Sequence, residues 1–408
     1  METQTEYSEN GSSKIRAFRA HWIVPVSRPP IEDGTIVIRG DKIIAVDNTE
    51  NIRNDWKADL NDLDDAIVFP GFINVHTHLE HPLAEDVPSG FLDYQKSLKL
   101  HGIDVEAEQR LQIVRNNISD CIARGTVALA DFSDDGNSGA LLLENNIFAR
   151  VFHELKSFKH FEAPHQFREH QRRIKDFPIS KELTQHLAPS SVWTVSPPLF
   201  RQISINERHI AIHMNMSAAE REFTLNGRGP IKQLLHAWAD FDYTWKIPAQ
   251  SPVDYFFRNH FYAKHNILIH MIDTDLQDIE TIKEQPAKVN ICVCPRAGEI
   301  LSLGKAPVQT FLEKGLNICL GTESRMTVPD LDIRNEMIKG VDLYGVTPEN
   351  VMKFATLNGA YAIGFHKEVG SLDEGKTSRC LLLRGGAGDK RNPYESILES
   401  DQAVEWLV

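Results

Sequence analysis

The stretch that decides the fold is PGFINVHTHLE, residues 70–80 of the chain. Its apolar run FINV is short and ends at two histidines, which is typical of a buried β-strand. Alternate residues of a strand point to the same face, so the imidazoles of His76 and His78 would project together. Two neutral imidazoles on one face suit a Zn or Fe ion. The chain has 17 histidines, so an H-x-H pair also arises by chance and needs support from the rest of the sequence.

Beyond this stretch, apolar strand-like runs alternate with longer amphipathic segments. The runs include TVALADFS, VWTVSPPL, HIAIHMN, NILIHMI, VNICVCP and NICLGTE. This alternation predicts a parallel sheet, and roughly seven or eight units over ~300 residues favour a (β/α)8 barrel, the TIM barrel. After the last run, Thr347 as N-cap and Pro348 at the first helical position predict one helix through ENVMKFATLNGAYAIGF.

The two ends of the chain have a different character. Residues 1–68 contain short β-branched runs such as GTIVIRG and KIIAVD, separated by turn residues, and residues 366–408 return to short strand-like runs such as SRCLLLRG. The strands at the C-terminal end are too short to stand alone. We therefore predict one small β-sandwich domain built from both chain ends, and a catalytic barrel over residues 69–365.

Composition narrows the classes of partner. The formal net charge is -13, which argues against nucleic acid and anionic membranes. No apolar segment approaches the ~20 residues that cross a bilayer, and the polar N-terminus lacks a signal-peptide pattern. Five cysteines fit reduced thiols, and Cys292-x-Cys294 has no second pair at zinc-finger spacing. The sequence predicts a cytoplasmic protein with a small-molecule substrate and neither a nucleic-acid nor a membrane partner.

Residues 70–80 resemble the first-strand signature of the amidohydrolase superfamily, and within it the branch of cyclic-amidine deaminases and triazine chlorohydrolases. The resemblance extends over nearly the whole chain, from IVIRGDKIIAVD to GSLDEGK, which resembles the closing strand of that family. It implies a metal-dependent hydrolase that uses metal-activated water to attack a carbon–nitrogen bond, other than a peptide bond, in a small N-heterocycle or cyclic amidine. A homodimer is compatible with this family.

Three further residues match metal-site positions of that family in chain order. His213 ends HIAIHM, where the resemblance implies a third metal ligand, although a lone histidine there is more often a core residue. His270 ends NILIH, where the family has a histidine that binds metal or polarises the attacking water. Glu323 stands where the family has an aspartate that binds metal and accepts a proton. The resemblance implies one divalent metal (zinc first, then Fe or Mn) held by His76, His78, His213 and Glu323, with His270 and Glu323 as catalytic groups.

The chain departs from the family next to His213. Relatives that deaminate aromatic rings carry a proton-shuttling glutamate three residues further on, and here that residue is Met216, whose thioether cannot carry a proton. Glu220 matches a second, more structural position. Three explanations follow: another acid such as Glu80 replaces it, the substrate has a good leaving group, or the fold is kept without catalysis.

Residues near the predicted strand ends are candidates for substrate contact, although structural packing explains each of them equally well. The third explanation leads to an alternative function, a binding protein with a degenerate active site. A hydrolase that opens a cyclic amide is a further alternative. The candidate substrate contacts are Glu80, His81, Trp193, Ser196, Met216 and Arg325.

Overall fold

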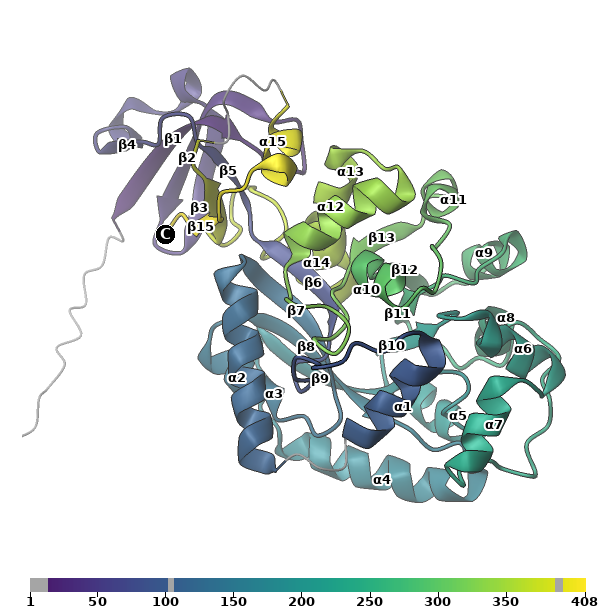
Figure 1. Cartoon of the computed structure of the whole chain (residues 1–408). Coiled ribbons are helices and arrows are strands. Elements are labelled where there is room, and N and C mark those ends of the chain that lie inside the picture. Colours follow the sequence, from purple (N-terminus) through teal and green to yellow (C-terminus); the bar gives the residue numbers. More distant parts are fainter. Residues whose placement is uncertain (1–13, 102–105, 386–391) are drawn as a thin grey trace, which may run out of the picture. The chain divides into compact units, whose positions relative to one another are not determined.

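The computed structural model describes residues 14–101, 106–385 and 392–408 (Figure 1). The chain divides into two compact units. One consists of Met1–Gly71 with Lys367–Val408, and the other of Phe72–His366. Within the described residues, no helix is both long and apolar enough to span a bilayer.

The first unit is built on a seven-stranded sheet with the order β15-β14-β5-β1-β2-β3, in which β4 also pairs with β1. Strand β14, from the C-terminal end, pairs antiparallel with β5, so both chain ends share one sheet. Apolar side chains form clusters that include Ile36 with Val68, and Val37 with Ile52. The elements are β1 (Ile15–Ile23), β2 (Ile31–Arg39), β3 (Lys42–Asn48), the 3-10 turns Thr49–Asn51 and Asn54–Trp56, β4 (Leu60–Asp62), β5 (Ile67–Pro70), β14 (Cys380–Leu383), α15 (Pro393–Glu399) and β15 (Glu405–Trp406).

The second unit contains two four-stranded sheets, with the orders β6-β7-β8-β9 and β10-β11-β12-β13, and every pairing within them is parallel. Most strand residues are buried, as expected for parallel strands with both faces covered. The strands are β6 (Phe72–Thr77), β7 (Thr126–Ser133), β8 (Phe148–Leu155), β9 (Leu183–Pro189), β10 (His209–Met214), β11 (His265–His270), β12 (Lys288–Val293) and β13 (Asn317–Leu320).

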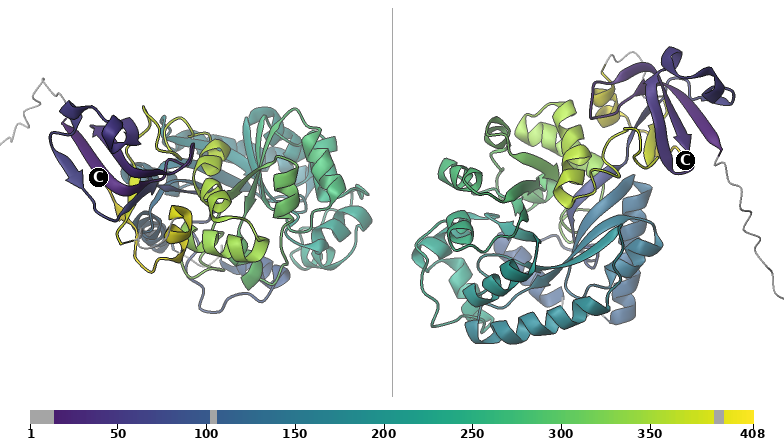
Figure 2. Two further views of the ribbon diagram at one scale, coloured as in Figure 1. Left: turned by 90° about the horizontal axis from the view of Figure 1, so that it is seen from above. Right: turned by 180° about the vertical axis from the view of Figure 1, so that it is seen from behind.

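Helices follow the strands and lie around the outside of them (Figures 1 and 2). Several of them, such as α2, α3, α5 and α14, pack against the strands and so complete the core of the unit. The helices are α1 (Phe91–His101), α2 (Ala107–Ala123), α3 (Ser138–Glu144), α4 (Ala163–Arg173), α5 (Pro197–Asn206), α6 (Ala218–Asn226), α7 (Pro230–Ala237), α8 (Pro252–Arg258), α9 (Leu276–Lys283), α10 (Pro295–Ile300), α11 (Val308–Glu313), α12 (Ile333–Tyr344), α13 (Pro348–Ala355) and α14 (Leu357–Ile363), with 3-10 turns at His160–Glu162 and Ile174–Asp176.

Isolated parallel bridges join the two sheets at both of their edges. Ser191 pairs with His213, and Thr77 pairs with Glu323. The Thr322 backbone N–H also donates to the His76 carbonyl at 2.9 Å. The eight parallel strands with their helices form the (β/α)8 fold, which confirms the predicted fold class. These edge contacts fall at the carboxyl ends of the strands, where barrel proteins carry their active sites.

The predicted strand at VWTVSPPL is wrong. Strand β9 ends at Pro189, and residues 192–194 form a turn between two isolated bridges that involve Ser191 and Val195. Pro197 is then at the start of α5, because the fixed φ of proline suits the first turn of a helix. Trp193 is 2% exposed although it belongs to a turn, so its burial does not come from strand pairing.

The single helix predicted after Thr347 is two helices. The N-cap is confirmed, since the Thr347 hydroxyl accepts from the Asn350 N–H at 3.2 Å. Helix α13 ends at Ala355, because the backbone of the next residue, Thr356, has φ -134° and ψ -93°, which are not helical. In α14, a side chain at Gly359 would place its Cβ 2.9 Å from the Ile73 Cβ, so this helix approaches β6 closely only because Gly359 has no side chain.

Candidate metal centre

The two histidines of the opening motif lie at the end of β6, as predicted, and two distant residues join them. His213 comes from the end of β10 and Glu323 follows β13. One donor atom from each of the four residues lies within 4.8 Å of every other. His76 and Glu323 are fully buried, at 0% and 1% exposure. The predicted ligands therefore converge at the carboxyl ends of the strands.

Glu323 is the centre of this group. Its Oε2 lies 2.6 Å from Nε2 of His76, and its Oε1 lies 3.6 Å from Nε2 of His78. Nε2 of His213 is 3.3 Å from Nε2 of His76. The His78 Nε2 atom is buried without a hydrogen-bond partner among the described residues. Three imidazole nitrogens and one carboxylate fit the ligand set of a Zn ion. A metal would also satisfy the buried Nε2 of His78.

His270 lies next to this group at the end of β11. Its Nε2 is 3.3 Å from Oε2 of Glu323, yet both ring nitrogens are buried and hydrogen-bonded to none of the residues described here. The backbones of His270 and Glu323 have φ values of 74° and 64°, in the left-handed region that residues other than glycine rarely adopt. Such strain is common at functional sites. The side chains of these two residues meet, with Nε2 of His270 3.3 Å from Oε2 of Glu323.

Electrostatics favour the protonation states that metal binding requires. Burial lowers the pKa of His78 well below its ordinary value, and the neighbouring His81 adds to this effect. Burial alone would raise the pKa of the Glu323 carboxyl, but attraction to His76 and the close approach of His270 outweigh burial and hold that pKa well below its usual range. Neutral histidines and an ionised carboxylate are the forms that bind a metal.

Cys294 is close to the centre, although the sequence gives it no zinc-finger partner. Its thiol, a ring nitrogen of His270 and a carboxylate oxygen of Glu323 lie within 4.8 Å of one another. All five cysteines are free and buried. Burial raises the pKa of the Cys294 thiol to about 11, so it is protonated at neutral pH.

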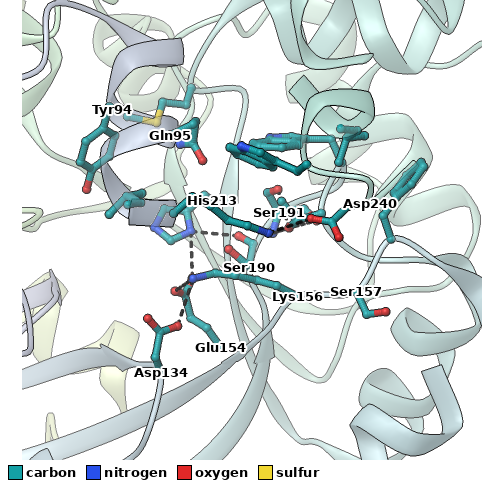
Figure 3. A pocket seen from close by; sticks show the side chains of 18 of the residues that line it. Tyr94, Gln95, Asp134, Glu154, Lys156, Ser157, Ser190, Ser191, His213 and Asp240 are labelled. Atoms are coloured by element: carbon teal, nitrogen blue, oxygen red, sulfur yellow. Dashed lines mark hydrogen bonds and ion pairs between the residues drawn. The ribbon is translucent and has the colours of Figure 1, made fainter. Parts of the chain in front are cut away.

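A carboxylate and a lysine lie behind His213 (Figure 3). Nδ1 of His213 is 2.9 Å from the Ser190 carbonyl oxygen and 3.5 Å from Oε1 of Glu154. Lys156 forms ion pairs with Glu154 at 3.1 Å and with Asp134 at 3.0 Å. A fixed partner on the second ring nitrogen orients a ligating histidine, so these contacts support His213 from outside the metal centre.

A cavity of about 390 Å³ opens onto this centre, and its lining includes His78, His213 and Glu323. An aromatic wall borders it, since Trp193 and Trp238 stack with ring centroids 6.3 Å apart and Phe91 meets Trp193 edge-on at 6.1 Å. One face of α1 supplies residues at helical spacing. These residues of α1 are Phe91, Tyr94, Gln95, Leu98 and Lys99.

The candidate substrate contacts divide into two groups. His81, Trp193 and Met216 line the cavity. Glu80, Ser196 and Arg325 are not among its lining residues. Ser133 donates its hydroxyl hydrogen to buried Glu80, Ser196 precedes α5 as its N-cap residue, and Arg325 donates to the Pro329 carbonyl at 2.9 Å.

The sequence analysis missed three residues of the site: Tyr94, Glu154 and Lys156. The Tyr94 hydroxyl donates to Oε1 of Glu323 at 2.5 Å, and all three residues line the cavity. The nearest available signal is the spacing of cavity-facing residues along α1, but the same pattern marks any amphipathic helix.

The family model for the amidohydrolase family matches residues 67–394. The chain belongs to the amidohydrolase family. A 5-methylthioadenosine/S-adenosylhomocysteine deaminase of Moorella thermoacetica is 25% identical over 398 residues, an alignment that covers 91% of this chain and 85% of the relative. Membership confirms the predicted family and its class, hydrolases that act on carbon–nitrogen bonds.

Solved structures of this family share the fold at low sequence identity. The aminofutalosine deaminase of Helicobacter pylori, in complex with methylthio-coformycin, has a TM-score of 0.82 and 18% identity, and the match covers 94% of this chain and 95% of that one. An adenosine deaminase of Xanthomonas campestris with bound zinc has a TM-score of 0.77 and 17% identity, and the match covers 94% of this chain and 89% of that one. Both likenesses extend over the barrel and the chain ends.

Proposed function

We propose that this chain is a metal-dependent deaminase that releases ammonia from a cyclic amidine within a small N-heterocycle. Among such heterocycles, purine nucleosides are the first candidate substrates. The observation that carries the proposal is the convergence of three histidines and Glu323 at the end of a cavity with an aromatic wall. Relatives named as 5-methylthioadenosine/S-adenosylhomocysteine deaminases support this substrate class.

The proposed cofactor is one zinc ion, held by His76, His78, His213 and Glu323. A bound divalent metal acts as a Lewis acid and lowers the pKa of water, which supplies a nucleophile at neutral pH. The same proposal includes a cytoplasmic location, which the five free and buried cysteines support. A homodimer stays a prediction.

Residues around the metal centre and the cavity have separate roles in the proposed reaction. Glu323 accepts the proton of the attacking water, because its carboxylate is ionised and its Oε2 faces His76 and His270. His270 orients the water and stabilises charge that develops on the substrate. The aromatic wall of Trp193 and Trp238 offers flat apolar surfaces that suit a heterocyclic ring. His270 and Glu323 are 2% and 1% exposed, and shielding from water strengthens electrostatic contacts such as theirs.

One observation favours a second function, a binding protein without catalysis. Met216 lines the cavity and is 2% exposed, at the position where the resemblance implies a proton-carrying glutamate. General acid–base help is worth roughly 10²–10⁴-fold in rate. A chain that had lost this group and gained no substitute would still bind a heterocycle.

Ammonia release separates the two functions. The zinc-loaded chain is incubated with 5′-methylthioadenosine, S-adenosylhomocysteine, adenosine, guanine and hydantoin, and ammonia is measured by an enzyme-coupled assay. We expect ammonia from at least one purine, and none with Glu323→Gln. Tight purine binding without ammonia, at one metal per chain, would establish the binding protein instead. Ring opening of hydantoin without ammonia would establish the cyclic-amide hydrolase.

A further inference from the structure

We propose that Tyr94 is the positioning residue for Glu323: its hydrogen bond to Oε1 fixes the carboxylate so that Oε2 faces His76 and His270. This inference rests on the proposed metal centre and does not require that the substrate be known. It assigns a role to helix α1, from which the sequence predicts no metal ligand.

The two oxygens of Glu323 have separate partners. Oε1 accepts the Tyr94 hydroxyl hydrogen at 2.5 Å and lies farther, 3.6 Å, from Nε2 of His78. Oε2 lies 2.6 Å from Nε2 of His76 and 3.3 Å from Nε2 of His270. Tyr94 and Glu323 are each 1% exposed, so water does not compete for these contacts. A hydroxyl-to-carboxylate bond of this kind is roughly twice as strong as one between neutral groups. The carboxylate is therefore held in one rotational position.

A glutamate needs such a restraint more than an aspartate does. Glutamate has one more side-chain torsion, and the terminal torsion of its carboxylate is broad rather than confined to sharp wells. Without a partner for Oε1, the Glu323 carboxylate would be free to turn and to offer the metal both oxygens or neither. The other polar contact of Tyr94, with the Ser324 Oγ at 3.5 Å, is long and does not constrain Glu323.

The placement of Tyr94 suits this role. It belongs to the face of α1 that also carries Phe91, Gln95, Leu98 and Lys99 into the cavity lining. Tyr94 is 1% exposed, so the side chains packed around its ring limit the positions that its hydroxyl can take. The extra methylene of Glu323, compared with aspartate, thus lets one carboxylate reach both the Tyr94 hydroxyl and the ligand histidines.

A purely structural explanation makes a different prediction. Buried tyrosine hydroxyls usually find a hydrogen-bond partner, and Glu323 would then only satisfy Tyr94. In that case, Tyr94→Phe would change stability and leave the metal environment unaltered. The positioning role requires that the metal environment change, and that the change depend on the length of residue 323.

The test is a double-mutant cycle with Tyr94→Phe, Glu323→Asp and the double variant, each loaded with cobalt(II). Visible absorption of cobalt reports the ligand geometry, and competition with a chelator gives the metal affinity. Tyr255→Phe is the matched control, because Tyr255 is also buried, at 5% exposure, but does not line the cavity. Circular dichroism verifies that each variant is folded before it is loaded.

We expect Tyr94→Phe to change the cobalt spectrum and to weaken metal binding by about 10–100-fold, the usual effect of removing an outer partner of a ligand. In the Glu323→Asp background, the same substitution should change metal affinity by less than about twofold, because the shorter carboxylate no longer spans both partners. Tyr255→Phe should leave the spectrum unchanged.

Two results would overturn the proposal. One is an unchanged cobalt spectrum in folded Tyr94→Phe protein. The other is an equal loss of affinity in both backgrounds, which would show that Tyr94 acts independently of residue 323. Both readouts are independent of ammonia release. A chain without deaminase activity that still shows the coupling would refute the proposed function and keep this inference.

Discussion

The pH dependence of stability tests the environment of Glu220, a buried residue that lines the cavity. This side chain, in the first turn of α6, is 1% exposed. Its Oε1 accepts from the Met216 backbone N–H at 3.0 Å, and its Oε2 has no hydrogen-bond partner in the described parts of the chain. Burial raises the pKa of Glu220 from 4.5 to about 8. The folded chain therefore keeps this carboxyl protonated at neutral pH, while the unfolded chain ionises it.

The sign and size of the effect follow from these two pKa values. Between pH 4.5 and about pH 8, the folded state binds more protons at Glu220 than the unfolded state, so the free energy of unfolding falls as pH rises through this window. At ~1.36 kcal/mol per pKa unit, the full cost above pH 8 is about 5 kcal/mol. For a barrel unit of about 300 residues, ~2.1 cal/mol/K per residue converts this cost into a Tm lower by about 8 °C.

Glu220→Gln isolates this cost, because glutamine keeps the carbonyl acceptor and the shape of the protonated acid but cannot ionise. We expect the Tm of the variant to match wild type near pH 5 and to exceed it by up to about 8 °C at pH 9, as measured by calorimetry at equal metal loading. Glu222→Gln, at a partly exposed position of the same helix, controls for the loss of one charge. A Tm difference that stayed constant from pH 5 to pH 9 would refute the reasoning.

Four further predictions concern the site and the core. His213→Ala should lose most of its bound metal, as measured by atomic emission on the dialysed protein. Met216→Glu should raise kcat/KM for ammonia release by roughly 10²-fold or more, while Met216→Gln, which carries no transferable proton, should not. Glu154→Gln should lower kcat by about 10²-fold, measured at saturating metal because Glu154 also lies 3.5 Å from Nδ1 of His213. Gly359→Ala should destabilise the chain by about 1–3 kcal/mol in thermal unfolding, because its Cβ would lie 2.9 Å from the Ile73 Cβ.

The convergence of the four candidate ligands could be predicted because each one carries a local signal. His76 and His78 follow an apolar run, and His213 and Glu323 end or follow runs of the same kind. Parallel strands bring their carboxyl ends to one edge of the sheet, so residues far apart in sequence meet there once the barrel is assumed. The same logic failed for VWTVSPPL, because an apolar run before a Pro-Pro pair packs equally well as a turn and a helix start.

The partners of those ligands could not be predicted in this way. Tyr94 and Glu323 are 229 positions apart, and nothing near Tyr94 distinguishes it from the other tyrosines. Glu154 is near the end of β8 and Lys156 follows that strand, and such a sequence resembles any buried strand with a charged end. Their roles arise from the curvature that brings neighbouring strand ends together, and that is a property of the folded barrel and not of any segment.

The structure also narrows the explanations for the missing acid at Met216. Glu80 was the first candidate for a replacement acid. Its carboxylate accepts hydrogen bonds from the Ser133 hydroxyl and, at 3.1 Å, from the Asp134 N–H, and it does not line the cavity. Glu154 does line it, and its buried Oε1 accepts no hydrogen bond from the residues that the structure describes. A buried carboxylate oxygen without a donor costs free energy, which a substrate N–H would recover on binding. Glu154 is therefore one candidate for the acid that replaces the missing glutamate.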